Sequence, residues 1–158
     1  MVVGTLADRA ANKIGANSQL ARAMAYYHDL GKTANPTMFV ENQIGSSNPH
    51  DGLLPMESAN ILKAHVTEGV KLAKRFKIPE IVYRGILEHH GDAVIRFFYE
   101  KEKTINQNVS KDEFRHIGNK PTTKESAILM MADSLEAACR AIFMLSLIHI
   151  SEPTRQAS

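Results

Sequence analysis

The chain has 158 residues, 44% of them hydrophobic, which is enough to bury one core, so we expect a single domain. Its 19 basic and 17 acidic residues leave a net charge of +2, and so small an excess excludes the strongly basic surface typical of proteins that bind nucleic acids or anionic membranes. The one cysteine, Cys139, cannot form an internal disulfide and indicates a reducing compartment, and we expect neither a membrane span nor a signal peptide in these residues.

Apolar residues recur three and four positions apart almost throughout the chain, which predicts an all-α domain. The first helix is expected to end at Gly15, because glycine readily takes the left-handed conformation found after helices. Ser18 is expected to cap a second helix, which Gly31 closes. His28 and Asp29 would then lie in the last turn of that helix.

Residues 33–55 are polar and rich in Asn, Ser, Gly and Pro, which predicts an ordered loop or a lid. His50 and Asp51 in this stretch repeat the His-Asp dipeptide, and their expected use is in hydrogen bonds that stabilise turns. A third helix is expected over about residues 58–76, with His65 on its apolar face.

A fourth helix is expected to start near Pro79, which suits a first helical turn, and to end at Gly91. His89 and His90 immediately precede that end. Successive helical residues diverge by about 100°, so two adjacent histidines can reach one metal ion only where the helix unwinds. The position of Gly91 therefore favours a shared role for the two histidines.

A fifth helix is expected over about residues 93–103, where three aromatic residues follow one another. Three consecutive helical residues cannot share one face, so we expect Phe97 and Phe98 in the core and Tyr99 accessible. An accessible Tyr99 can bind substrate by stacking on adenine. His116 lies in the polar loop that follows, and we expect it to be solvated.

The last helix is introduced by residues 122–125, Thr-Thr-Lys-Glu, which match a capping box. Its apolar line is expected to consist of Ile128, Met131, Leu135 and Ala138. Asp133 lies off that line in a mostly apolar stretch, and burial would be unfavourable for it without a cation or donors nearby. The alternative is a solvent-facing aspartate.

Six side chains in these elements are of the kinds that bind divalent iron, manganese or zinc: His28, Asp29, His65, His89, His90 and Asp133. A set without cysteine indicates a catalytic metal site rather than a structural zinc site. Asp29 offers two oxygens, so it can bridge two metal ions. Taken alone, each part has a plainer alternative, which is a helix cap for His28 with Asp29 and a core histidine for His65.

Taken in order, the pattern His-Asp, His, His-His, Asp resembles the HD-domain metal-dependent phosphohydrolases. It looks closest to the cytoplasmic domain of the seven-transmembrane-receptor HD proteins, the PgpH-type cyclic di-AMP phosphodiesterases. The likeness covers about residues 2–143 and is carried by residues 26–32, 41–51, 65, 88–91 and 124–138. The fold that it implies is an HD-domain helical bundle.

The resemblance implies two divalent transition-metal ions, manganese or iron, bridged by Asp29. His28 and Asp133 would complete the protein ligands of one ion, and the other would be held by His65, His89 and His90. A metal-activated hydroxide would then cleave cyclic di-AMP to linear pApA. Lys32 would steady the phosphate, and its alternative is an exposed lysine at a helix C-terminus.

The partner that the resemblance implies is a cyclic dinucleotide, with no nucleic acid. The parent protein would be embedded in the plasma membrane with this domain on the cytoplasmic side, and a homodimer is allowed but not specified. Two alternatives remain open: an HD phosphohydrolase for another nucleotide substrate, and a catalytically impaired nucleotide-binding sensory module.

Both ends of the chain depart from the family pattern. The family has a further ligand histidine in a His-Ser pair just before the counterpart of Val2, and without it we expect weaker metal binding and reduced or absent activity. Residues 146–157 resemble translated sequencing-adapter read-through. We therefore assign residues 1–143 to the domain and 144–158 to a non-native tail, and we exclude His149 from any site.

Overall fold

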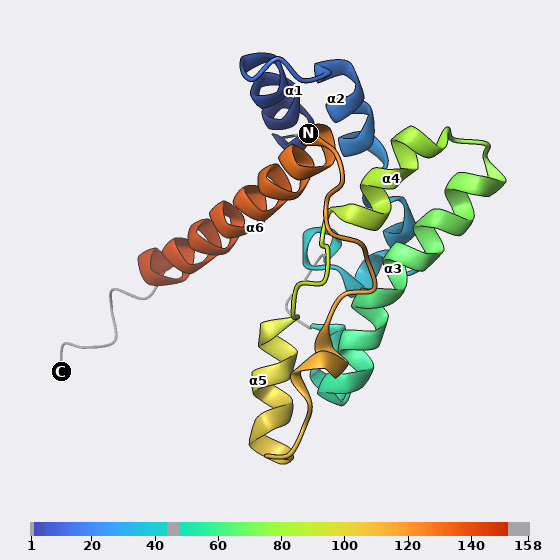
Figure 1. Cartoon of the computed structure of the whole chain (residues 1–158). Coiled ribbons are helices and arrows are strands. Elements are labelled where there is room, and N and C mark those ends of the chain that lie inside the picture. The colour runs from blue at the N-terminus through green and yellow to red at the C-terminus, as the bar shows by residue number, and fades with distance from the viewer. Residues whose placement is uncertain (1, 44–47, 152–158) are drawn as a thin grey trace.

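The computed structural model describes residues 2–43 and 48–151, with side chains up to Phe143. Within this part of the chain there are six α-helices, five short 3₁₀ helices and no β-strand, which confirms the all-α prediction. The α-helices are α1 Val2–Lys13, α2 Ser18–Tyr27, α3 Pro55–Arg75, α4 Glu80–Glu88, α5 Arg96–Ile105 and α6 Lys124–Ser151 (Figure 1). None of the helices in the described ranges is both long and apolar enough to cross a membrane.

The 3₁₀ helices lie in the connections: η1 Leu30–Ala34, η2 Pro36–Met38, η3 Val40–Asn42, η4 Pro49–Gly52 and η5 Lys111–Phe114. Four of them fall between α2 and α3, so the stretch expected as an ordered loop is a series of short turns in its described part. Residues 44–47 of that stretch lie outside the described residues.

The main core is formed by α1, α2 and α6, and α4 packs against α2 and α6. Small residues dominate it, with Ala7, Ala11 and Ala21 fully buried around Met24 and Leu129. Small side chains let helix backbones approach closely, and a Cβ atom on Gly85 of α4 would lie 2.9 Å from the Met24 Cβ. A second core joins α3, α5 and η5 through Ala59, Phe98 and Phe114.

The helix ends explain two differences from the sequence-based expectations. Gly15 does follow α1 with a φ of +68°, as expected. Asn17, not Ser18, caps α2, because its side chain accepts a hydrogen bond from the Leu20 N–H at 3.0 Å. Gly31 does not close α2: this helix ends at Tyr27, and Gly31 lies within η1 where the chain passes very close to α3.

The apolar line expected on α6 is confirmed at Ile128 and is wrong at Met131, Leu135 and Ala138. Met131 is 71% exposed and Leu135 54% exposed, whereas Ile128, Leu129 and Ala132 are buried. The helix packs against α1, α2 and α4 only over its first turns, and its second half extends away from the other helices (Figure 1). Because the packed face of α6 is that of Ile128, Leu129 and Ala132, Asp133 lies at the edge of this face rather than toward solvent.

Helix α6 is capped one residue later than expected. Thr123 and Ser126 exchange hydrogen bonds, with the Ser126 N–H donating to the Thr123 Oγ1 at 3.1 Å. Glu125 instead accepts from the Asn17 N–H at 2.8 Å. The helix continues through Ser151, so the predicted domain end at residue 143 is not marked by a helix end. The last part of the predicted tail, residues 152–158, lies outside the described residues.

Candidate metal centre

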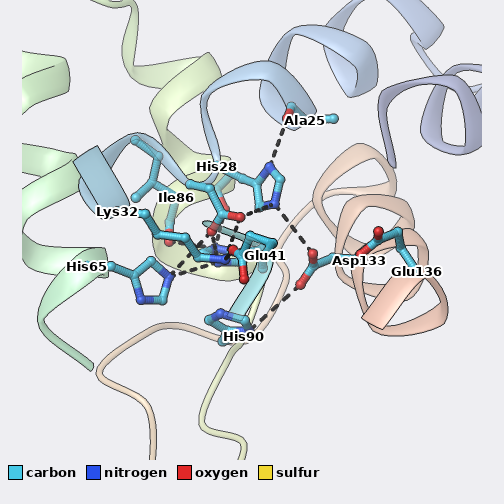
Figure 2. A network of polar contacts seen from close by, with 12 residues as sticks. Ala25, His28, Lys32, Glu41, His65, Ile86, His90, Asp133 and Glu136 are labelled. Carbon is cyan, nitrogen blue, oxygen red and sulfur yellow. Dashed lines mark hydrogen bonds and ion pairs between the residues drawn. The ribbon is translucent and has the colours of Figure 1, made fainter. Parts of the chain in front are cut away.

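Four separate elements bring the six predicted donors together. His28 and Asp29 follow the end of α2, His65 lies in the middle of α3, and Asp133 lies in the third turn of α6. His89 and His90 follow α4, where Gly91 reverses the chain with a φ of +55°. Figure 2 shows His28, His65, His90 and Asp133 directed toward a common centre, with Lys32 and Glu41 beside them.

The donors form two groups. One consists of His28, Asp29 and Asp133, and the other of His65, His89 and His90. In each group, one nitrogen or oxygen atom per residue lies within 4.8 Å of its counterparts, which is the spacing that ligands around a single metal ion require.

Asp29 lies between the two groups. Its Oδ2 is 3.1 Å from the His28 Nε2, and its Oδ1 is 3.7 Å from the His89 Nε2 and 3.8 Å from the His65 Nε2. The two oxygens of one carboxylate therefore face different groups, which is the geometry needed to bridge two ions.

Three of the histidines are oriented by the same local hydrogen bond. The Nδ1–H of His28 donates to the Ala25 carbonyl at 2.8 Å, and that of His89 to the Ile86 carbonyl at 2.9 Å. His65 donates in the same way to the carbonyl of Leu62, three residues earlier in α3. Each bond fixes the imidazole ring and leaves Nε2 directed into the centre, as second-shell partners of metal-binding histidines do.

The donor set fits a cation because two nitrogen lone pairs face each other. The Nε2 atoms of His65 and His89 are 3.2 Å apart, and both Nδ1 atoms already carry the donated proton. Burial lowers the pKa of His65, and burial together with the positive charge of His28 lowers the pKa of His89 to about 3. Both rings are therefore neutral at neutral pH, and a cation between the two lone pairs would relieve their repulsion.

His28 is in the opposite charge state. Although burial disfavours its charge, the carboxylates of Asp133 and Asp29, at 3.4 and 3.1 Å from its Nε2, raise the pKa of His28 to about 10. The imidazolium in turn lowers the pKa of the Asp29 carboxyl, despite burial. Without a metal ion, a proton on His28 thus neutralises part of the charge of the two carboxylates, at 3.1 Å from Asp29 and 3.4 Å from Asp133.

Metal binding to the group that contains His28 should release about one proton per chain at pH 7.5. The proton must leave Nε2 before this atom can bind a metal, and a pKa of about 10 keeps it there up to alkaline pH. Between pH 7 and 9 the affinity of this group should rise about tenfold per pH unit. Titration calorimetry in two buffers with different ionisation enthalpies measures the released proton, and a flat affinity over this range would contradict the assignment.

The same shift predicts how the metal-free protein responds to pH. The pKa of His28 is raised above its ordinary value of 6.5, so its contribution to stability is complete below pH 6.5 and is lost as the pH rises toward 10. The free energy of unfolding of the metal-free protein, measured in urea, should therefore fall between pH 7 and 10. The His28→Gln substitution should remove both this pH dependence and the release of a proton on metal binding.

His116 was expected to be solvated, and that expectation is wrong. Its ring is stacked on His90, with centroids 4.1 Å apart and an interplanar angle of 27°, and burial lowers its pKa to about 4. An antiparallel backbone bridge between Val94 and Arg115 places this loop at the site. Its two hydrogen bonds run from the His116 N–H to the Ala93 carbonyl at 2.9 Å and from the Ile95 N–H to the Phe114 carbonyl at 2.8 Å. Such long-range pairing leaves no periodic signal in the sequence.

Two cavities flank the centre, with volumes of about 680 and 380 Å³. Both are lined by Lys32, Val40, Glu41 and His90. Lys32 Nζ lies 2.7 Å from Asp29 Oδ2 and also donates to Glu41, and these carboxylates raise its pKa although burial opposes the charge. Its ammonium group therefore stays charged where the two cavities meet.

The aromatic residue exposed near the site is Phe97, not Tyr99. Phe97 is 71% exposed and lines the smaller cavity together with the buried Phe98. Tyr99 is half-buried against Phe114, with ring centroids 5.9 Å apart, and is not among the residues that line either cavity. The expectation that Phe97 lies in the core and Tyr99 is accessible is therefore wrong, because α5 packs against the second core through Phe98 and Tyr99 and leaves Phe97 exposed.

The chain resembles proteins of one family over most of its length. A model of the HD domain matches residues 2–138. The chain is 44% identical to the cyclic-di-AMP phosphodiesterase PgpH of Bacillus subtilis over 142 residues, which are 90% of this chain and 20% of that protein. It is 42% identical to the cyclic-di-AMP phosphodiesterase PgpH of Listeria monocytogenes over 152 residues, which are 96% of this chain and 21% of that protein.

The fold is similar to that of a solved relative. The crystal structure of the HD domain of the L. monocytogenes phosphodiesterase PgpH, in complex with cyclic di-AMP, superposes with a TM-score of 0.87 at 44% identity. The similarity covers 89% of this chain and 65% of that one. The present chain thus spans about a fifth of the length of the two PgpH proteins and about two thirds of the crystallised domain.

Proposed function

The chain belongs to the HD domain family, and from this premise we propose that it is a metal-dependent phosphodiesterase that hydrolyses cyclic di-AMP to linear pApA. This membership confirms the resemblance indicated by the order of the metal-binding residues in the sequence. The relatives from Bacillus and Listeria are cyclic-di-AMP phosphodiesterases, and the similar crystal structure contains cyclic di-AMP.

The observation that carries the proposal is the position of Asp29, whose two oxygens face two different donor groups. We assign His28, Asp29 and Asp133 to one metal ion, and Asp29 with His65, His89 and His90 to the other. The chemistry that a bound pair would supply is activation of water for attack on phosphorus and withdrawal of negative charge from the phosphoryl oxygens.

Lys32 offers a positive charge of the protein itself to a phosphate at the candidate metal centre. Its Nζ lies 2.7 Å from Asp29 Oδ2, so a phosphodiester placed at the centre is within reach of the ammonium group. Lys32 lines both cavities, of about 680 and 380 Å³, and these give space for the two nucleosides of a cyclic dinucleotide. Lys32 thus orients the substrate. The ring of Phe39, whose centroid lies 5.1 Å from the Lys32 Nζ, limits the movement of the ammonium group.

We further propose that the metal ions are manganese or iron and that the domain lies on the cytoplasmic side of a membrane. Four imidazoles and two carboxylates suit manganese or iron. The two PgpH relatives are about five times longer than this chain, which leaves room for a membrane-embedded parent with this domain on its cytoplasmic side. A homodimer is compatible with this arrangement, and the net charge of +2 gives no reason to propose a nucleic-acid partner.

Manganese-dependent hydrolysis of cyclic di-AMP tests the proposal. The chain should be compared with a form in which the family's His-Ser pair precedes Val2, because Val2, Val3 and Gly4 line the larger cavity together with His28 and Asp133. We expect the extended form to produce pApA with Mn²⁺ and none with EDTA. We expect the unextended chain to be slower by tenfold or more, on the order of the loss caused by a weakened metal ligand shell.

The other outcomes separate the alternatives. Faster turnover of a nucleoside monophosphate or triphosphate than of cyclic di-AMP would indicate an HD phosphohydrolase with another substrate. Binding of two metal ions and of cyclic di-AMP without cleavage would overturn the enzyme proposal and indicate a nucleotide-binding module. Chromatography of the products, together with metal analysis of the same samples, distinguishes these cases.

A further inference from the structure

Arg140 lies on the same face of α6 as the metal-binding aspartate. Asp133, Glu136 and Arg140 follow one another at intervals of three and four residues, so all three lie on one side of the helix. All three line the larger cavity. At about 1.5 Å per residue, Arg140 is about 10 Å along α6 from Asp133. The wall that α6 contributes to the cavity therefore carries a carboxylate of the candidate metal centre and, about two helical turns farther along, Arg140.

An unbroken series of charged contacts connects Arg140 with the centre. Its Nη2 donates to Glu136 Oε1 at 2.6 Å, and its Nη1 lies 3.7 Å from Glu41 Oε2. The other oxygen of Glu41 accepts from Lys32, which in turn contacts Asp29 (Figure 2). The guanidinium side chain is 36% exposed, so part of its donor fork remains open to the cavity.

The charges that line this cavity leave one position for a second phosphate. The acidic residues are Asp29, Glu41, Asp133 and Glu136, and the permanently positive ones among the described lining residues are Lys32 and Arg140. Lys32 contacts Asp29, so its ammonium group is placed to bind the phosphodiester at the candidate metal centre. A second anionic group in the larger cavity is repelled by the carboxylates and is attracted only where Arg140 lies.

We propose that Arg140 binds the phosphodiester of the cyclic dinucleotide that is not being cleaved. A cyclic dinucleotide has two phosphodiesters, and only one can lie at the metal centre during a single cleavage. A guanidinium suits the second because its planar fork can donate two hydrogen bonds to one phosphate. This inference rests on the proposed function and assigns a subsite to it. Arg140 is thereby a substrate-binding residue and takes no part in bond cleavage.

Two substrates separate this role from a structural one. Cyclic di-AMP has two phosphodiesters and bis(p-nitrophenyl) phosphate has one, so only the first can use the Arg140 subsite. Arg140→Gln should raise the KM for cyclic di-AMP about tenfold or more, as for loss of a charge-assisted hydrogen bond, with little change in kcat. The KM for bis(p-nitrophenyl) phosphate should change less than about twofold. Arg140→Lys, which keeps the charge, should restore part of the affinity.

Arg84→Gln is the matched control. Arg84 also lies on a helix four residues after a glutamate that it contacts, at 3.6 Å, and its side chain is 38% exposed, but it lines neither cavity. The measurements use whichever of the two forms described above is active. An unchanged KM for cyclic di-AMP in Arg140→Gln, or an equal rise for both substrates, would overturn the subsite. Absence of cyclic di-AMP hydrolysis in the unsubstituted protein would instead overturn the proposed function.

Discussion

The Asp29→Asn variant is expected to bind at most about one metal ion per chain and to lose cyclic di-AMP hydrolysis by a factor on the order of a thousand or more. Asparagine keeps the shape of the side chain but replaces one oxygen by an NH2 group, whose nitrogen is not a metal ligand, and it removes the negative charge. The oxygen that faces His28 and the one that faces His89 can then no longer both be ligands. Loss of this carboxylate also removes one of the charges that raise the pKa of His28.

Asp51→Asn is the control for this variant. His50 and Asp51 repeat the dipeptide of His28 and Asp29, but Asp51 is exposed in η4 and the His50 ring contacts the Met38 carbonyl at 2.8 Å. We expect this second substitution to leave two bound ions and full activity. Metal analysis of both purified variants, with circular dichroism to verify the helices, decides the question. Two tightly bound ions in Asp29→Asn would contradict the bridging role.

The two donor groups could be anticipated from the sequence because local rules position most of their members. Gly91 marks the place where α4 ends, and its φ of +55° lets the chain unwind just after His89 and His90. His65 is on the helix face that also carries Val66 and Gly69, which are buried as the apolar periodicity predicts. In both cases the residue type and its spacing along one helix contain the necessary information.

Other features depend on contacts between elements and could not be predicted in this way. The apolar residues of α6 fit two possible faces, and only packing against Met24 and Gly85 selects the face of Leu129 over that of Met131. Likewise, the choice between Phe97 and Tyr99 as the exposed ring depends on where η5 places Phe114. Single-helix periodicity cannot distinguish such alternatives when apolar residues occur on several sides.

Gly31 shows how the fold and the site depend on each other. The position of this glycine in the sequence predicts a helix stop, which would require a positive φ, yet its φ is not in that range. A Cβ atom at this position would lie 1.8 Å from the His65 carbonyl oxygen and 2.5 Å from the Gly69 nitrogen. Glycine is therefore needed here because the backbone after α2 touches the backbone of α3. That contact sets the separation of 3.8 Å between Asp29 Oδ1 and His65 Nε2.

Gly31→Ala should consequently lower the free energy of unfolding by about 3 kcal/mol or more, because the obstructing atoms belong to the backbone and cannot rotate away. Gly69→Ala should cost less, about 1–2 kcal/mol, since the nearest atom to its new Cβ is the Cγ2 methyl of Ile86 at 2.8 Å and the nearest backbone atom, the Gly31 nitrogen, is 3.1 Å away. For Gly52→Ala no described atom lies within 4 Å of the new Cβ, and we expect a change within about 0.5 kcal/mol.

Urea unfolding of the metal-free proteins, followed by circular dichroism, measures this order. If Gly31→Ala does not fold at all, the expected order of stabilities still holds, provided that Gly69→Ala is destabilised and Gly52→Ala is not. If Gly31→Ala folds with reduced stability, it should also bind metal ions more weakly, because η1 must move away from α3 and carry Asp29 away from His65. Equal stability of the three variants would mean that the close approach of η1 to α3 does not fix the positions of the two donor groups relative to each other.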